Sequence, residues 1–133
     1  MAYIKYKELT RYFNFNQQVL EKDIPSYVKQ YVLDEEEIYL VYKVRSDLCV
    51  FTNKKLILFD IRGMFQRNKK IHFLPYSQIS SSAIQYKPTS VSVYLSMSSG
   101  YQLRLNFVNQ TADSKTSLRV AYVKMMALIG RVQ

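Results

Sequence analysis

Glycine, histidine and cysteine are scarce in this chain of 133 residues, which holds three glycines, one histidine and one cysteine. Because the glycines stand far apart at Gly63, Gly100 and Gly130, no glycine-rich nucleotide-binding fingerprint can be written. One histidine and one cysteine cannot supply the four ligands of a structural zinc site. We therefore expect no cofactor, no metal and no catalytic residue, and we predict that the protein is not an enzyme.

His72 and Cys49 are the side chains that nucleophilic or general-base catalysis would use first. His72 lies in a strand-like run, residues 69–75, with Ile71 and Phe73 expected on the opposite face. Cys49 stands among apolar residues and is expected to be a buried small hydrophobe. Nothing in the sequence favours a lowered thiol pKa or a meeting of the two side chains.

Long apolar runs and a signal peptide are also missing. No stretch reaches the roughly 18 uninterrupted apolar residues of a membrane span, and the start "MAYIKYKELTRYF" is charged and aromatic. The lone cysteine cannot form an internal disulfide, which agrees with a reducing compartment. We expect a cytoplasmic protein, with a peripheral position at the inner face of the membrane as the alternative.

Charge is unevenly distributed along the chain. Residues 1–36 hold five basic and six acidic residues, whereas residues 37–133 hold fourteen basic and four acidic ones. A basic excess favours anionic partners without selecting among phospholipid, nucleic acid and acidic protein. Nucleic acid is the least supported of the three, because no nucleic-acid-binding motif occurs and most aromatic residues fall at inward positions.

The first 33 residues have a helical period. Apolar side chains recur every three or four residues in two sets, Tyr3, Tyr6, Leu9 and Phe13, then Tyr27, Val28, Tyr31 and Val32. Pro25 suits the start of the second helix. We predict that residues 1–33 form short helices that pack on the rest of the chain or on a partner.

From residue 37 the apolar period changes to two, which is typical of β-strands. The first strand is predicted to carry one apolar face, formed by Ile38, Leu40, Tyr42 and Val44. The clearest hairpin turns at Ser98-Ser99-Gly100. About seven strands are predicted, at residues 37–44, 48–52, 56–61, 69–75, 76–87, 91–97 and 101–107, and the polar segment 76–87 is expected to be one strand or a strand pair.

A helical stripe follows the strands, formed by Leu118, Tyr122, Met125 and Ile129. Asp113 or Ser114 is expected to cap this helix. Seven antiparallel strands and one such helix predict a mainly β (α+β) fold, in which the helix covers the mouth of a strongly bent sheet or partly open barrel.

Residues 33–86 contain a set of motifs that resembles the bacterial pleckstrin homology-like (PH-like) family. The motifs are "DEEEI" before the first strand, "VRSD" before "CVFTNKKLILFD", the glycine of "IRG", and "LPYSQI". The resemblance implies a PH-like seven-stranded barrel with a C-terminal helix over residues 34–133. It also implies a capacity to form homo-oligomers, since rings and other assemblies are known in that family, whose members are mostly of unassigned function.

The chain departs from the family pattern after "IRG", where "MFQRNKK" replaces a short glycine-containing turn. An apolar tip inside a basic collar is suited to an anionic membrane surface. Together with the preceding turn, the candidate anion- or lipid-contacting residues are Lys54, Lys55, Arg62, Met64, Phe65, Arg67, Lys69 and Lys70. In the alternative reading the lysines are only solvated, and Met64 and Phe65 fold back on the domain or meet another subunit.

Two further segments complete the expectations. Residues 34–37 are predicted to form a solvated acidic turn rather than a cation site. The aromatic residues of the N-terminal segment are predicted to be buried on the barrel or against a partner, and the candidate partner-contacting residues are Tyr3, Tyr6, Phe13 and Phe15. We hypothesise a non-catalytic module for protein contacts and self-association, with peripheral binding of anionic phospholipid as the alternative.

Overall fold

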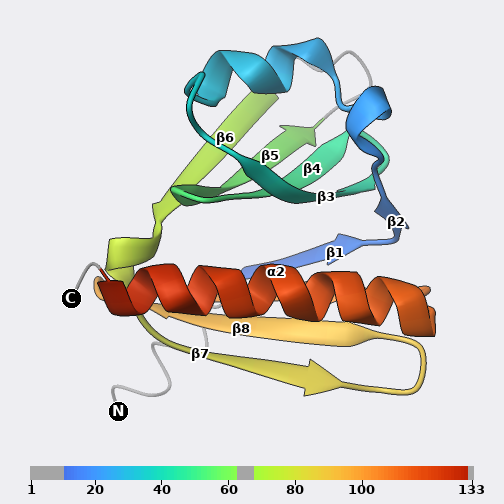
Figure 1. Ribbon diagram of the computed structural model, residues 1–133, viewed down its shortest axis with the longest axis vertical. Coiled ribbons are helices and arrows are strands. Elements are labelled where there is room, and N and C mark those ends of the chain that lie inside the picture. Colours follow the sequence, from blue (N-terminus) through green and yellow to red (C-terminus); the bar gives the residue numbers. More distant parts are fainter. Residues whose placement is uncertain (1–10, 63–67, 132–133) are drawn as a thin grey trace.

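The computed structural model describes residues 11–62 and 68–131, which form two β-sheets and a long C-terminal helix (Figure 1). The strand order is β1-β9-β8-β7 in the first sheet and β2-β3-β4-β5-β6 in the second. The two sheets pack face to face at an angle, and among the described residues no strand pairing joins them into a closed barrel. The predicted mainly β fold, with a bent sheet and a C-terminal helix, is confirmed.

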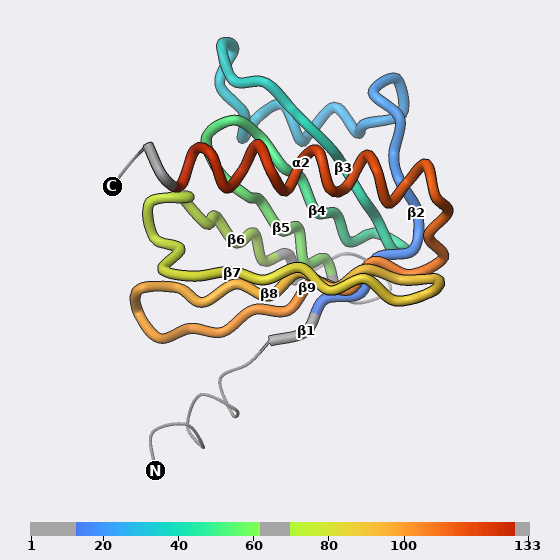
Figure 2. The backbone as a smooth tube through the Cα atoms, turned by 60° about the horizontal axis from the view of Figure 1, so that its bottom comes forward, coloured from blue at the N-terminus to red at the C-terminus, as the bar shows by residue number. Residues whose placement is uncertain are grey.

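All seven predicted strands are present. They are β3 Ile38–Val44, β4 Asp47–Thr52, β5 Lys55–Arg62, β6 Asn68–Pro75, β7 Ile79–Tyr86, β8 Val91–Met97 and β9 Gln102–Phe107. Pairing among these strands is antiparallel. After Pro75 a short 3₁₀ helix, η3 Tyr76–Gln78, carries the chain from the second sheet to the first (Figure 2).

The prediction of a helix through Phe13 is wrong. Residues Arg11–Phe15 form strand β1, which pairs in parallel with β9, and Gln17–Gln18 form β2, which pairs with β3. Strand pairing prevails here because Phe13 and Phe15 alternate with asparagines and both are buried. The earlier members of the predicted helical set, Tyr3, Tyr6 and Leu9, lie outside the described residues.

The second predicted helical set does form a helix, of the 3₁₀ type. η1 Glu21–Asp23 and η2 Ser26–Tyr31 cross the outer face of the second sheet, where Val28 is fully buried. This cover explains why β4 and β5 read as continuous apolar runs, because both faces of these strands are buried. The outer cluster consists of Val28, Val41, Leu48, Val50, Ile57 and Phe59.

In β3, one of the four residues that were predicted to share an apolar face points to the opposite side of the strand. Leu40, Tyr42 and Val44 face the main core as expected, but Ile38 packs against the outer cluster. A register shift between Ile38 and Leu40 is the cause. A bulge adds one residue to one strand, so the side chains before it change face.

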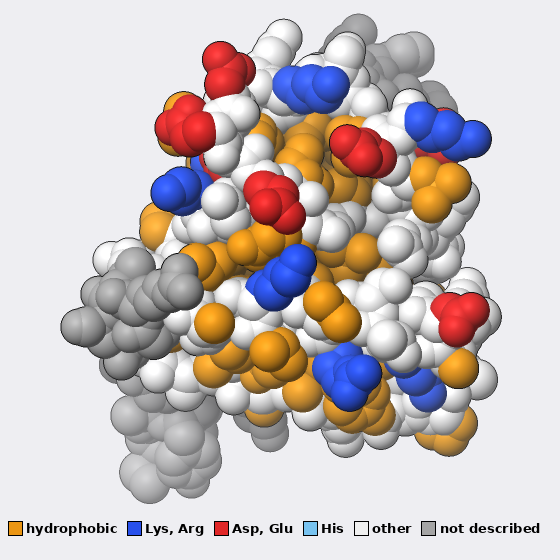
Figure 3. Space-filling model, viewed as in Figure 1, with side chains coloured by type: hydrophobic (Ala, Val, Ile, Leu, Met, Phe, Trp, Pro, Cys, Tyr) orange, Lys and Arg blue, Asp and Glu red, His pale blue; other side chains and the backbone are white. Residues whose placement is uncertain are grey.

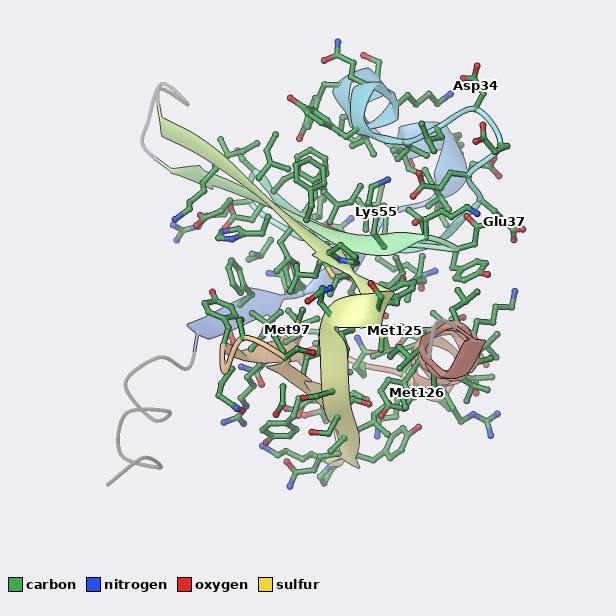
Figure 4. All side chains as sticks on the ribbon, turned by 90° about the vertical axis from the view of Figure 1, so that its left-hand side faces the viewer. Asp34, Glu37, Lys55, Met97, Met125 and Met126 are labelled. Atoms are coloured by element: carbon green, nitrogen blue, oxygen red, sulfur yellow. The ribbon has the colours of Figure 1, made fainter. Side chains whose placement is uncertain are left out.

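Helix α2, Ala112–Arg131, lies along the open side between the two sheets (Figure 1). Its inner stripe is buried as predicted, with Leu118 and Met125 fully enclosed and Met125 lying across the core from Met97 (Figure 4). The predicted cap is wrong, because Thr111 caps the helix. Thr111 Oγ1 accepts the Ser114 N–H at 3.2 Å, and Ser114 Oγ accepts the Thr111 N–H at 2.8 Å.

Candidate interaction surfaces

The turn between β4 and β5 is built around the hydroxyl of Thr52. Thr52 Oγ1 accepts the backbone N–H groups of Lys54 and Lys55, each at 3.0 Å, and donates to Glu36 Oε2. Thr52 is fully buried, so these bonds satisfy a hydroxyl that water cannot reach. The turn is thus fixed by its own side chain and by one carboxylate from the preceding loop.

Glu36 and Lys55 form a partly buried ion pair in this turn. Lys55 Nζ lies 2.7 Å from Glu36 Oε1 and 3.0 Å from Oε2, and the backbone N–H of Leu33 donates to Oε1 at 3.1 Å. The Glu36 side chain has no exposed surface and that of Lys55 is 20% exposed. The prediction of a solvated acidic turn is therefore wrong for Glu36, although Asp34, Glu35 and Glu37 are exposed.

Burial and hydrogen bonding act in opposite directions on Glu36. Burial by itself raises the pKa of its carboxyl group, whereas the hydrogen bonds from Lys55, Thr52 and Leu33 and the charge of Lys55 lower it. The bonds prevail, so the pKa of Glu36 is below its ordinary value of 4.5. Glu36 is held as a carboxylate and Lys55 is committed to it.

Two further contacts join this cluster to the rest of the domain. Asn53 exchanges hydrogen bonds with Glu37, each 2.9 Å long, and the buried hydroxyl of Tyr76 donates to the carbonyl of Thr52 at 2.7 Å. We name Glu36, Thr52, Lys55 and Tyr76 the turn cluster. Its members lie in the segments "DEEEI", "TNKK" and "LPYSQI" that carry the family resemblance, so these motifs fix the fold.

The other candidate lipid-contacting residues are only partly described. Lys54 and Lys70 are exposed, as a contact with an anionic surface requires. Arg62 ends β5 and Lys69 lies in β6, and their side chains are outside the description. Met64, Phe65 and Arg67 lie outside the described residues. Lys55 is withdrawn from such a surface by its bond to Glu36.

Of the four candidate partner-contacting residues, the structure describes two. Phe13 is 9% exposed and Phe15 is 1% exposed, and both lie in the main core of this chain, where Phe15 stacks on Phe107. Of the two readings for these phenylalanines, packing within the chain is the one observed. Tyr3 and Tyr6 lie outside the described residues.

His72 and Cys49 occupy the strand positions that were predicted for them. His72 contacts Phe13 edge-on, with ring centroids 5.8 Å apart, while Ile71 packs on the opposite face of β6. Cys49 is fully buried and burial raises the pKa of its thiol. Within the described ranges, no three His, Cys, Asp or Glu side chains are placed to share a metal ion.

A hollow of about 420 Å³ opens beside His72, between the β6 edge of the second sheet and the turn that joins β8 to β9. Its floor is core, with Leu58, Leu74 and Leu103, and its rim includes Lys70. Asp60 stands directly across the strand pair from Lys70. Because this arrangement sets a carboxylate beside the lysine, the hollow has no clear preference for an anion.

The outer face of α2 is the feature that sequence reasoning missed. Val120 is 45% exposed and Val123 is 58% exposed, on the side of the helix away from the core, while Met126, at the flank of the helix, accepts a hydrogen bond from Ser82 of β7 at 2.9 Å. The space-filling view shows apolar surface along this helix with basic side chains among it (Figure 3). The signal was present, because "VAYVKMMALIG" has few polar residues on either side.

Basic side chains flank the outer face of α2. Arg119 and Lys124 are both exposed, and the ammonium group of Lys124 lies 4.7 Å from the centre of the Tyr39 ring. Lys115 donates to the carbonyls of Lys87 and Pro88 at 2.7 and 2.9 Å. None of the described helices is long and apolar enough to cross a bilayer.

Three solved structures have a similar fold. A DUF1696 family protein with a pleckstrin-homology domain from Shewanella loihica gives a TM-score of 0.66 over 81% of this chain and 94% of its own, at 22% identity. A pleckstrin homology domain from Shewanella amazonensis gives 0.52 over 77% and 89%, at 27% identity. A PH domain containing protein from Exiguobacterium sibiricum gives 0.60 over 89% and 63%, at 18% identity.

Two curated relatives come from Bacillus subtilis. The uncharacterized protein YozO is 46% identical over 54 residues, which are 41% of this chain and 46% of YozO. The uncharacterized protein YjqA is 33% identical over 54 residues, which are 41% of this chain and 43% of YjqA. The chain thus spans about half the length of the curated relatives it matches.

The family model for the bacterial PH domain matches residues 9–89, more than half of the chain. The chain belongs to the bacterial PH domain family.

Proposed function

We propose that this PH domain is a non-catalytic interaction module that associates with further copies of itself through the outer face of α2. The observation that supports the proposal is the exposure of Val120 and Val123 on a helix whose inner face is already buried in the core. A helix that is apolar on both sides is normally covered on both sides. Exposed apolar patches of this kind mark interaction sites.

The setting of the face agrees with a protein contact in the cytoplasm. Val120 and Val123 are three residues apart and therefore neighbours on the helix surface, and the exposed Arg119 and Lys124 lie beside them, as polar residues do at the rims of protein interfaces. The only cysteine is buried as a free thiol, which fits a reducing compartment.

Sedimentation velocity over a range of protein concentrations tests the proposal. The parent chain is expected to associate, and Val123→Glu is expected to sediment as a monomer, because it places a charge in the middle of the contact. Phe73→Ser is the matched control, since Phe73 is 46% exposed but lies on β6. A parent chain that stays monomeric at all concentrations would refute self-association.

Peripheral binding of anionic phospholipid is the second candidate. It is supported by the exposure of Lys54 and Lys70 at the ends of strand connections and by the basic excess of residues 37–133. Each basic residue near an anionic surface contributes at most about 1 kcal/mol, so the binding would be weak and sensitive to salt. Co-sedimentation with neutral and anionic vesicles at two salt concentrations tests it. Binding that is confined to anionic vesicles and lost in Arg67→Gln/Lys69→Gln/Lys70→Gln would support it.

A further inference from the structure

A hollow of about 520 Å³ lies at one end of the second sheet, between η1, the start of η2 and the turn that joins β3 to β4. Strand β2 forms its edge, and the chain passes from β2 into η1 beside it (Figure 1). Its apolar part includes the buried Leu48 and the half-buried Pro25. Small-molecule sites in proteins commonly have a volume of this order, with apolar surface and a few convergent polar groups.

The polar side chains that line this hollow are not used by the fold. They include Gln17, Asp23, Tyr27, Lys43, Arg45 and Ser46. Within the described ranges, none of these side chains forms a hydrogen bond or an ion pair. On the outer face of the first sheet, by contrast, Ser92 donates to Asn106 and Asn106 donates to Asn14, each at 2.9 Å. The hollow therefore presents donors and acceptors that are open to a ligand.

Arg45 stands beside the hollow at an unfavourable backbone position. It begins the two-residue turn between β3 and β4, and its φ of 53° lies in the left-handed region. Glycine or asparagine normally fills such a position in a short hairpin turn. Glycine would serve the turn better, so the arginine indicates a role for its side chain.

The motif "VRSD", which contains this turn, is only partly explained by the fold. Its last residue is structural, because Asp47 Oδ1 accepts the backbone N–H of Ile61 at 2.9 Å. Arg45 and Ser46 instead line the hollow. They differ in this from the motif residues of the turn cluster, whose side chains are bonded within the domain.

Both signs of charge meet at the hollow. Lys43 and Arg45 come from the hairpin of β3 and β4, whereas Asp23 ends η1. An anion alone would meet the carboxylate of Asp23, and a cation alone would meet two basic groups. A small molecule that carries a carboxylate at one end and an ammonium group at the other matches both.

Tyr27 adds a neutral donor at the same wall. Its ring packs edge-on against Phe59, with centroids 5.5 Å apart, so the side chain is held in place. Burial, and after it the charge of Asp47, raise the pKa of the Tyr27 hydroxyl, which therefore keeps its proton. With the amide of Gln17 and the hydroxyl of Ser46, it can bond the polar groups between the two ends of a ligand.

We infer that this hollow is a binding site for a small zwitterion, whose ammonium group meets Asp23 and whose carboxylate meets Lys43 and Arg45. A free amino acid and a short peptide with free ends share this chemistry. The site is independent of the proposed self-association, because its described residues include none of α2.

Titration followed by the NMR shifts of the backbone amides tests the site and separates the two sources. The probes are alanine and trialanine, each also with an acetylated amino group and with an amidated carboxyl group. Blocking either end is expected to weaken binding at least about tenfold, because charged groups of the hollow are then left without a counterpart. Tighter binding of alanine would assign the site to free amino acids, and tighter binding of trialanine to short peptides.

Two variants show which end of the probe meets which charge. In Asp23→Asn, acetylation of the probe should no longer weaken binding, and in Lys43→Gln/Arg45→Gln, amidation should no longer do so. Lys22→Gln/Lys29→Gln is the matched control, because it removes the same charge from exposed positions that do not line the hollow. This control is expected to bind the probes as the parent does.

Three outcomes would overturn the inference. The first is the absence of shift changes at the hollow with both open probes at their highest soluble concentrations. The second is equal binding of the open and blocked forms, which would show that the charged ends are not recognised. The third is an equal loss of binding in the control, which would show a general effect of charge in place of a site.

Discussion

The β4–β5 turn and the outer face of α2 are both surface features, and they differ in what their side chains contact. The turn displays two adjacent lysines, yet Lys55 is bound to the buried Glu36 and takes part in the packing of the domain. Val123 of the helix is 58% exposed and belongs to neither cluster of core residues in the described part of the chain. The comparison teaches that a conspicuous basic motif can serve folding while an apolar stripe that is less obvious in the sequence stays exposed.

The physical basis of the difference is the environment of each group. A buried charge is costly unless it is paired and hydrogen-bonded, so Glu36 and Lys55 depend on each other. An exposed valine costs little while the chain is alone and gains from burial when a partner arrives. Substitutions in the turn should therefore reduce stability, and substitutions on the helix should reduce association.

The largest expected loss of stability follows from removing Lys55. Lys55→Met leaves the carboxylate of Glu36 buried without its cation, and we expect a loss of about 3 kcal/mol in the free energy of unfolding. Urea titration measures this loss. Lys54→Met is the matched control, because Lys54 is the exposed neighbour, and it should change stability by less than about 0.5 kcal/mol. Equal effects of the two substitutions would contradict the role assigned to the ion pair.

A smaller loss is expected for Thr52→Val. Valine preserves the shape of the side chain but removes the bond to Glu36 and the acceptor of two backbone N–H groups. We expect a destabilisation of about 2 kcal/mol, measured in the same way. A Thr52→Ser variant, which keeps the hydroxyl, should retain most of the stability. If valine and serine behaved alike, the hydroxyl would not be what fixes the turn.

The turn cluster should also make stability depend on acid. Because the pKa of Glu36 is lower in the folded than in the unfolded state, its contribution is complete above the ordinary value of 4.5 and is lost as the pH falls through the lowered pKa. The urea midpoint of the parent should therefore fall more steeply below pH 4.5 than that of Glu36→Gln, which has no carboxyl group at this position. Parallel curves for the two proteins would show that Glu36 does not contribute.

The substitution that should weaken association most, Val123→Glu, is expected to have the smallest effect on the stability of the fold. Val123→Glu changes an exposed helix position, so the free energy of unfolding of the monomer should shift by no more than about 0.5 kcal/mol. Measurement at a concentration below the onset of association separates folding from binding. A large destabilisation of the monomer would mean that Val123 is part of the fold, and the contrast with the turn would fail.

Strands β8 and β9 and the inner stripe of α2 could be predicted because their apolar side chains recur with the period of the element, and β4 and β5 because they are short apolar runs joined by a turn. Strand β1 could not, since its pairing with β9 joins segments about ninety residues apart. The signal that remained was the two-residue spacing of Phe13 and Phe15, which is too short to outweigh a helical pattern in the same stretch.

The buried ion pair and the exposed outer face of α2 were harder to predict than the fold. In the run Asp34–Glu37 the carboxylates look alike, and only the position of Thr52 and Lys55 in space turns Glu36 inward. The prediction used only the inner stripe of α2, although Val120 and Val123 on the other side of the helix are apolar as well. A test of both sides of the helix for apolar residues would have found the outer face.

Site-specific cross-linking tests the central claim most directly, because the only native cysteine, Cys49, is buried and inert. Val120→Cys, on the outer face of α2, and Phe73→Cys, on β6, are made in separate chains with nearly equal exposure at the two positions, and each chain alone is treated with a short bifunctional maleimide. The account predicts that Val120→Cys chains are linked to one another at concentrations where the parent associates and that Phe73→Cys chains are not. Equal linking of the two variants, or no links between Val120→Cys chains at those concentrations, would contradict it.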